Sequence, residues 1–177
     1  LAAYTKIAKE EATNPLRYDT VGTLYLQDGR PLEAEAFLRE SLRLNPASAP
    51  THYNLGLALS MMRRFSDAEY EFQEAVRRDP GHAEALNNLG AMHHVAGDLD
   101  RAATYYRRAA AIRPDNAEAR NNLGRVLSTQ GQDAAAVIEY RAALALRPDM
   151  ASALSGLGWA LATSSDPAVR NPVEAIQ

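Results

Sequence analysis

Glycine recurs in this chain at a fixed spacing of 34 residues, and proline keeps the same spacing. The positions are Gly22, Gly56, Gly90, Gly124 and Gly158, and then Pro46, Pro80, Pro114 and Pro148. A fixed repeat of this length indicates one supersecondary unit that is stacked on copies of itself. The spacing therefore predicts an elongated solenoid in which each unit packs on its neighbours, without a single central core.

Other residue types keep the same register. An alanine stands twelve residues after each of the first four glycines, and a bulky residue stands four residues further on: Ala34, Ala68, Ala102 and Ala136, then Leu38, Phe72, Tyr106 and Tyr140. Apolar residues recur around them at three- and four-residue steps, which is typical of amphipathic helices. Each unit is thus predicted to hold two helices. Helix A surrounds the glycine, and helix B ends at the proline, which cannot continue a helix.

A tight turn is predicted between helix A and helix B of each unit. The turns are expected at Gly29, Arg63, Gly97 and Gly131. Ser66 or Asp100 is expected to cap the helix that follows. A glycine inside helix A costs about 1 kcal/mol relative to alanine, so its recurrence needs a packing reason. We expect the glycine and the alanine of helix B to let the two backbones approach closely.

These recurring residues resemble the tetratricopeptide repeat. The shared order is Leu-Gly, an aromatic residue or Leu, Ala, an aromatic residue, Ala and Pro, and it stays in register over four copies. One departure is that the large residue four positions before each glycine is never Trp. The resemblance implies an all-α fold, an α-solenoid of antiparallel helix pairs in a right-handed superhelix. It also implies that helices A line a concave groove in which partners lie as extended peptides or helices.

The chain is predicted to be a single domain of such repeats. Full repeats are expected at 15–48, 49–82, 83–116 and 117–150, preceded by a partial repeat at 1–14 that holds a helix B and followed by an incomplete repeat at 151–177. A five-residue insert is expected between Thr163 and Pro172, because the Glu174-Ala175 pair arrives late. The absence of an initiator methionine and the half-repeats at both ends predict a fragment of a longer protein.

Composition limits the kinds of partner. The formal net charge is −3 and the pI is about 5.8, so the chain lacks the basic field with which proteins bind nucleic acid. No stretch reaches the roughly 18 to 20 apolar residues of a membrane span, and we expect a soluble domain of the cytoplasm or the periplasm. The chain has no cysteine, which excludes disulfides, thiolate zinc sites and thiol catalysis.

The histidines do not predict an active site. The four are His52, His82, His93 and His94, and none has the spacing of a metal-binding motif with another histidine or a carboxylate. His93 and His94 project about 100 degrees apart on a helix, so they cannot face one metal together. His93 is expected to pack in the core, because Tyr25, Leu59 and Leu127 occupy its position in other repeats. We predict no catalytic residue, no metal and no cofactor.

Polar residues recur on the predicted concave face. The expected peptide-binding residues are Tyr53, Asn54, Asn87, Asn88, His94, Asn121, Asn122 and Arg125. The asparagines among them form a row, here called the asparagine ladder, and a carboxamide can both donate to and accept from the backbone of an extended peptide. The row resembles the ladder in the repeat domain of protein O-linked N-acetylglucosamine transferases. Alternatively, these asparagines bond the backbones of neighbouring helices or are a common choice in the repeat.

A different groove chemistry is not predicted. Chaperone-binding members of the family clamp a C-terminal carboxylate with cationic and asparagine side chains at positions three before and one after the glycines. Arg125 is the only cation at those positions in this chain. A clamp of that type is therefore not expected, and the preference for acidic C-terminal tails should be weak.

The predicted function is a non-catalytic scaffold that binds a peptide or helix of a partner protein along the groove of helices A. The alternative is a substrate-recruiting accessory domain of a larger enzyme, such as a glycosyltransferase or a membrane-associated enzyme. A third possibility is end-to-end self-association through apolar residues of the terminal helices, which are Leu1, Tyr4 and Ile7 at one end and Val173 and Ile176 at the other.

Overall fold

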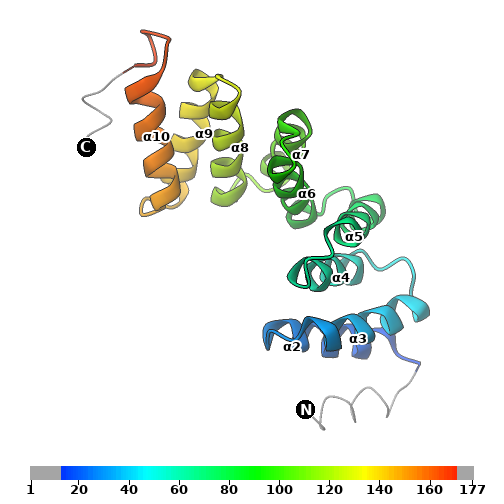
Figure 1. The fold of residues 1–177 in the computed structure, drawn as a ribbon. Coiled ribbons are helices and arrows are strands. Elements are labelled where there is room, and N and C mark those ends of the chain that lie inside the picture. Colours follow the sequence, from blue (N-terminus) through cyan, green and yellow to red (C-terminus); the bar gives the residue numbers. More distant parts are fainter. Residues whose placement is uncertain (1–12, 171–177) are drawn as a thin grey trace. The chain divides into compact units, whose positions relative to one another are not determined.

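The computed structural model describes residues 13–170, and within that range it contains helices and loops but no strand (Figure 1). The helices are α2 (Pro15–Gln27), α3 (Pro31–Leu44), α4 (Ala49–Met61), α5 (Phe65–Arg78), α6 (Ala83–Val95), α7 (Leu99–Ile112), α8 (Ala117–Thr129), α9 (Asp133–Leu146) and α10 (Ala151–Thr163). Residues 1–12 of the predicted partial repeat, the Glu174-Ala175 pair and the terminal apolar residues proposed for self-association lie outside the described residues.

The described helices follow the predicted alternation. Helices α2, α4, α6, α8 and α10 are helices A, and α3, α5, α7 and α9 are helices B. Helix A packs on helix B of the same repeat, as α2 does on α3, α4 on α5 and α8 on α9, and each helix B also packs on the next helix A where α3 meets α4, α7 meets α8 and α9 meets α10. The predicted all-α solenoid of repeated helix pairs is confirmed.

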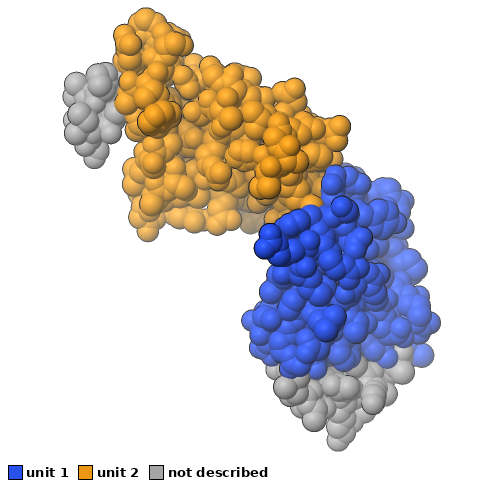
Figure 2. Space-filling view, viewed as in Figure 1, with its two compact units in different colours: residues 1–85 blue, residues 86–177 orange. Residues whose placement is uncertain are grey.

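The chain divides into two compact units, Leu1–Ala85 and Leu86–Gln177, which Figure 2 colours blue and orange. Large buried side chains of the first unit include Val21, Leu38, Leu55, Leu59 and Phe72. The core of the second unit is built around Tyr106, Leu123, Val126, Leu127 and Tyr140. Each unit thus contains its own apolar core, made from the inward faces of its helices A and B.

All four predicted turns occur where the sequence places them. The backbone takes a positive φ at Gly29 (69°), Arg63 (62°), Gly97 (80°) and Gly131 (74°). Glycine adopts this left-handed region without the steric cost that a Cβ brings. Arg63 is the one described residue other than glycine with a positive φ, so the second repeat makes the same turn with a less suitable residue.

The predicted helix caps were wrong. Helix α5 begins at Phe65 and α7 begins at Leu99, so Ser66 and Asp100 lie inside the first turns of these helices. Asp98 caps α7, and its carboxylate accepts a hydrogen bond from the backbone N–H of Arg101 at 3.1 Å. The left-handed turn residue is followed by a single non-helical residue, which makes each helix B start earlier than predicted.

The recurring glycines make room for the bulky side chains of helix B. A Cβ on Gly56 would lie 2.6 Å from a ring carbon of Phe72, and one on Gly90 would lie 2.8 Å from ring carbons of Tyr106. Such distances are too short for carbon atoms in contact. The predicted close approach to the alanine backbone is seen at Gly22, where such a Cβ would lie 3.4 Å from the carbonyl oxygen of Ala34. At Gly56 and Gly90 the nearest atoms belong instead to the aromatic side chain four residues after the alanine.

A polar pair crosses from helix A to helix B inside the second repeat. The Nδ1 atom of His52 lies 2.6 Å from Oε2 of Glu71, and its Nε2 atom lies 3.2 Å from the carbonyl oxygen of Pro46. Both side chains are buried. The two residues stand 19 positions apart in the sequence, a separation that matches no metal-binding motif and that only the packing of α4 on α5 brings together.

The fourth repeat places a similar pair at the same positions. An Nη1 atom of Arg120 lies 3.2 Å from Oε2 of Glu139, and Nε of Arg120 donates to the carbonyl oxygen of Pro114 at 3.0 Å. In the first repeat the same positions hold Tyr18 and Phe37, whose ring centroids lie 6.4 Å apart. The repeat therefore accepts either an ionic or an aromatic pair at this contact between helix A and helix B.

Candidate functional site

In the first unit, the two predicted groove residues contact other parts of the protein. The ring of Tyr53 lies 5.8 Å from that of Phe72 and 4.7 Å from that of His82, measured between centroids. The Nδ2 atom of Asn54, on α4, donates a hydrogen bond to the hydroxyl of Thr23, on α2, at 3.0 Å. Tyr53 is thus half-buried among aromatic side chains, and the amide of Asn54 links two neighbouring helices A.

In the second unit, the predicted asparagines occupy different environments. Nδ2 of Asn122 donates to Oδ1 of Asn87 at 3.3 Å, which joins α8 to α6. Asn88 is half-buried. Asn121 is only 3% exposed, and its Oδ1 atom is buried without a hydrogen-bond partner. The asparagines of the ladder are therefore not equivalent.

The carbonyl groups of two ladder residues face no donor from the protein. Among the described residues, the side-chain oxygens of Asn54 and Asn122 accept no hydrogen bond, whereas their amide nitrogens donate to neighbouring helices A. A carboxamide whose N–H groups are engaged still has an acceptor to offer. The side-chain oxygens of Asn54 and Asn122 are therefore acceptors without a donor among the described residues.

Two adjoining hollows lie between helices A of the second unit. One, of about 290 Å³, is lined by His94, Arg125, Ser128, Thr129, Tyr140 and Trp159. The other, of about 420 Å³, is lined by Arg125, Ser128, Tyr140, Ser152, Ser155, Gly156 and Trp159. Because the two share four lining residues, we treat them as one surface and call it the Arg125 groove.

Helix periodicity places the groove side chains of α8 on one face of that helix, and those of α10 on one face of α10. Arg125 and Ser128 are three residues apart on α8, and Ser152, Ser155 and Trp159 follow one another at three- and four-residue steps on α10. Residues at such steps lie on one face of a helix. Two faces of adjacent helices A therefore form opposite walls of the groove.

Tyr140 enters the groove from helix B of the fourth repeat. A Cβ on Gly124 would lie 2.9 Å from ring carbons of Tyr140, and one on Gly156 would lie 2.7 Å from its hydroxyl oxygen. The ring thus passes through a gap that glycines on α8 and α10 leave open. Tyr140 is only 2% exposed, and it lines both hollows of the groove.

The groove has one charged side chain. The Arg125 side chain is exposed and forms no ion pair or hydrogen bond with the described residues. Burial lowers the pKa of His94, and the nearby charge of Arg125 lowers it further, so His94 is neutral at pH 7. Burial raises the pKa of Tyr140 and that of the neighbouring Tyr106 to about 12. Both phenols therefore keep their protons.

Of the predicted site residues, the structure brings His94 and Arg125 to the same hollow. The asparagines do not line it. Sequence reasoning did not assign the wall residues Tyr140, Ser152 and Trp159 to the site. One sequence feature could have indicated that Tyr140 reaches this surface. Gly156 is an additional glycine two residues before the recurring Gly158, and it leaves room for a large side chain from a neighbouring helix.

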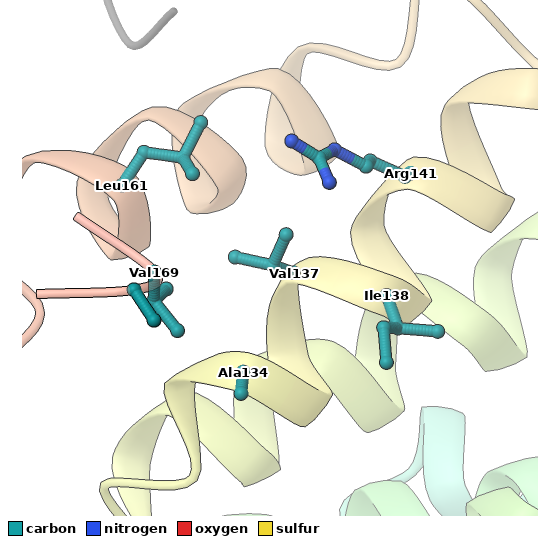
Figure 3. Close-up of a pocket in the computed structure, with 7 residues that line it drawn as sticks. Ala134, Val137, Ile138, Arg141, Leu161 and Val169 are labelled. Carbon is teal, nitrogen blue, oxygen red and sulfur yellow. The ribbon is translucent and has the colours of Figure 1, made fainter. Parts of the chain in front are cut away.

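A separate apolar hollow of about 240 Å³ lies on the side of α9 (Figure 3). Ala134, Val137, Ile138 and Arg141 of α9 line it, together with Leu161 of α10 and with Ala168 and Val169 of the segment that follows α10. Val169 packs against the small cluster formed by Val137, Ala160 and Leu161. In this way the segment after α10 covers part of the second unit's apolar surface.

Between residues 13 and 170, no three His, Cys, Asp or Glu side chains gather closely enough to hold a metal ion. None of the helices in this range combines the length and the apolar character that crossing a membrane requires.

Several solved structures resemble this chain in fold. YrrB, described as a TPR protein with an unusual peptide-binding site, has a TM-score of 0.79 and 22% identity, over 98% of this chain and 87% of that one. MamA has a TM-score of 0.75 and 27% identity, over 85% of this chain and 88% of that one. PilF of Pseudomonas aeruginosa has a TM-score of 0.75 and 25% identity, over 83% and 67% of the two chains.

Family models agree with these likenesses. One tetratricopeptide repeat model matches residues 53–117, 96–151 and 121–169, and a second matches residues 18–48. No curated protein sequence matches the chain. The matched segments cover most of the sequence and coincide with the repeated helix pairs. The chain belongs to the tetratricopeptide repeat family.

Proposed function

We propose that this chain is a non-catalytic protein-interaction scaffold, and that the Arg125 groove binds a peptide or a helix from a partner protein. The observation that carries the proposal is the position of Trp159, which is 67% exposed and lines the same hollows as Tyr140 and Arg125. Tryptophan, tyrosine and arginine are the residues most enriched at the energetic centres of protein interfaces. Their convergence on one concave surface favours binding of a protein segment.

The remaining wall residues suit a peptide backbone. The hydroxyls of Ser128, Ser152 and Ser155 have no hydrogen-bond partner among the described residues. A hydroxyl can both donate and accept, so these groups can pair with the N–H and C=O groups of a partner segment. The free carbonyl oxygen of Asn122, on the same helix as Arg125, adds an acceptor.

Family membership supports the general role. Tetratricopeptide repeat proteins present helices A as an interaction surface, and the Arg125 groove lies between helices α8 and α10, which are both helices A. YrrB has a peptide-binding site, but its 22% identity is a likeness of fold. The contacts proposed for this chain are therefore those of its own side chains.

Selection of peptides on the folded chain tests this proposal. Peptides from a random displayed library are selected on immobilised protein, synthesised with a fluorescent label and titrated by fluorescence anisotropy. We expect Trp159→Ala to weaken their binding about thirtyfold or more, because removal of an interface anchor costs about 2 kcal/mol or more. The matched control is Tyr70→Ala, which removes an aromatic ring that is 60% exposed on α5, a helix B.

The control variant should bind the selected peptides as the wild type does. Circular dichroism checks that both variants are folded. The proposal fails when no peptide is enriched, or when the selected peptides bind equally well to the wild type and to Trp159→Ala.

A further inference from the structure

Arg125 has no anionic partner, although an arginine on the same helix does. Arg120 pairs with Glu139 and also donates to the carbonyl oxygen of Pro114. Arg125, five residues later on α8, has no ion pair with any described residue. The difference arises from the neighbouring helices, since no carboxylate lines the hollows around Arg125. Its guanidinium therefore offers hydrogen-bond donors to a group from outside.

The other titratable groups do not change the charge of the groove. His94 is neutral at pH 7, because burial and then the charge of Arg125 lower its pKa. Tyr106 and Tyr140 keep their protons. Asp133 is near enough to raise the pKa of Tyr140, but it does not line the groove. The lining residues therefore carry a charge of about +1, on Arg125 alone.

A single arginine matches a carboxylate better than a phosphate. A guanidinium can donate two parallel hydrogen bonds to one carboxylate, and the two charges then cancel. A phosphorylated side chain carries a charge of about −1.5 to −2 at pH 7, so one arginine would leave a large part of it unmatched. The nearby hydroxyls of Ser128, Ser155 and Tyr140 can donate further hydrogen bonds to carboxylate oxygens.

An apolar surface lies beside this cation. Trp159 is largely exposed and lines both hollows with Arg125. Its indole can bury an aliphatic or aromatic side chain that neighbours the carboxylate in a bound segment. The groove thus combines one site for a negative charge with one apolar contact at its side.

We propose that the Arg125 groove selects an internal Asp or Glu side chain of the partner segment, next to an apolar or aromatic residue that packs on Trp159. This inference rests on the proposed function, because it names the residue type that the groove takes from a bound peptide. The carboxylate belongs to a side chain. A free C-terminus is therefore not required for binding.

Three peptide mixtures test this selection. They are fluorescein-labelled octapeptides, amidated at the C-terminus, with random flanking positions and a fixed central Phe-Glu, Phe-Gln or Phe-phosphoserine. We expect the Phe-Glu mixture to bind the wild type about tenfold more tightly than Phe-Gln, the size of effect typical of a charge-assisted hydrogen bond. Arg125→Gln should abolish the preference, so that the Phe-Glu and Phe-Gln mixtures bind this variant equally well.

The control variant is Arg107→Gln on α7, a helix B. Arg107 is also exposed and without a partner among the described residues, so its replacement changes the net charge by the same amount outside the groove. It should keep the preference for Phe-Glu. A preference lost equally in both variants would show a general electrostatic effect and would overturn the inference.

The other outcomes separate the two proposals. Equal binding of Phe-Glu and Phe-Gln, with binding still weakened by Trp159→Ala, overturns the acidic selection and leaves the scaffold function intact. Tighter binding of the phosphoserine mixture than of the Phe-Glu mixture also overturns it. When none of the mixtures and no displayed peptide binds, the proposed function itself fails.

Discussion

His52 and Glu71 form a buried hydrogen bond between helices α4 and α5, with 2.6 Å between Nδ1 and Oε2. The two residues are 9% and 8% exposed. In the third repeat the same two positions hold Leu86 and Tyr105, which carry no charge at pH 7. The repeat therefore does not need an ionic pair here, although the second repeat has His52 with Glu71 and the fourth has Arg120 with Glu139.

The energy of this pair can be measured with a double-mutant cycle. His52→Leu alone leaves the Glu71 carboxylate buried without its partner, which we expect to cost about 3 kcal/mol of unfolding free energy. The double variant His52→Leu/Glu71→Tyr copies the third repeat and should recover most of that loss. Urea denaturation at pH 7 measures both values. A double variant no more stable than His52→Leu alone would contradict this account.

The same pair makes stability depend on pH. Burial would lower the pKa of His52, but the hydrogen bonds to Glu71 and to the Pro46 carbonyl, together with the negative charges of Glu71 and Glu74, outweigh it and raise the pKa. A histidine with a raised pKa in the folded state adds stability that is fully present below its unfolded pKa, about 6.5. That stability is lost as the pH rises through the folded-state pKa. The advantage of the wild type over the double variant should therefore shrink as the pH rises from about 6 to 8.5.

Urea denaturation of the two proteins at several pH values measures this advantage. The pKa of His94 is lowered, so His94 changes the unfolding free energy with pH in the opposite direction to His52. Because His94 is present in both proteins, its effect cancels in the difference between them. A difference in unfolding free energy that stays constant or grows over this pH range would show that His52 does not titrate as described.

Gly90→Leu tests the reason for the recurring glycines. A Cβ at this position would already lie 2.8 Å from the ring of Tyr106, so a leucine must displace the ring or the helix. We expect a loss of about 1–3 kcal/mol in unfolding free energy, as is usual for overpacked cores. In a Tyr106→Ala background the same substitution should cost less. An unchanged melting temperature for Gly90→Leu would refute the packing role.

Arg63→Gly should stabilise the protein. Arg63 has a φ of 62°, and a side chain in this region costs about 1–2 kcal/mol. The greater freedom of glycine in the unfolded chain offsets about half of that gain, so we expect an increase of up to about 1 kcal/mol. Gly97→Ala, at a φ of 80°, is the reciprocal control and should lose about 1 kcal/mol. A lower urea midpoint for Arg63→Gly, or a higher one for Gly97→Ala, would contradict the assignment.

The repeated helix pairs could be predicted from sequence because their signals are local and periodic. The 34-residue register located the turns at Gly29 and Arg63, and at Arg63 it did so without a glycine to mark the turn. The helix caps were missed, because the cap position depends on how many residues the turn uses. Asp98 is the cap because α7 starts immediately after it.

Features that depend on contact between helices could not be predicted in the same way. The sequence marks Tyr140 as a bulky packing residue, but its place in the Arg125 groove depends on the gap that Gly124 and Gly156 leave on two other helices. The bond from Asn122 to Asn87 depends on the spacing of two helices A. Such distances follow from packing, and no single repeat contains them.

The fluorescence of Trp159 reports whether a bound peptide occupies the Arg125 groove. Trp159 is the only tryptophan of the chain, and it is 67% exposed in the Arg125 groove. A peptide that binds there must remove the indole from water, so tryptophan-free peptides should shift its emission to shorter wavelength. The shift should saturate with the Kd that anisotropy measures. Binding detected by anisotropy without any change in Trp159 emission would place the partner elsewhere and contradict the proposed groove.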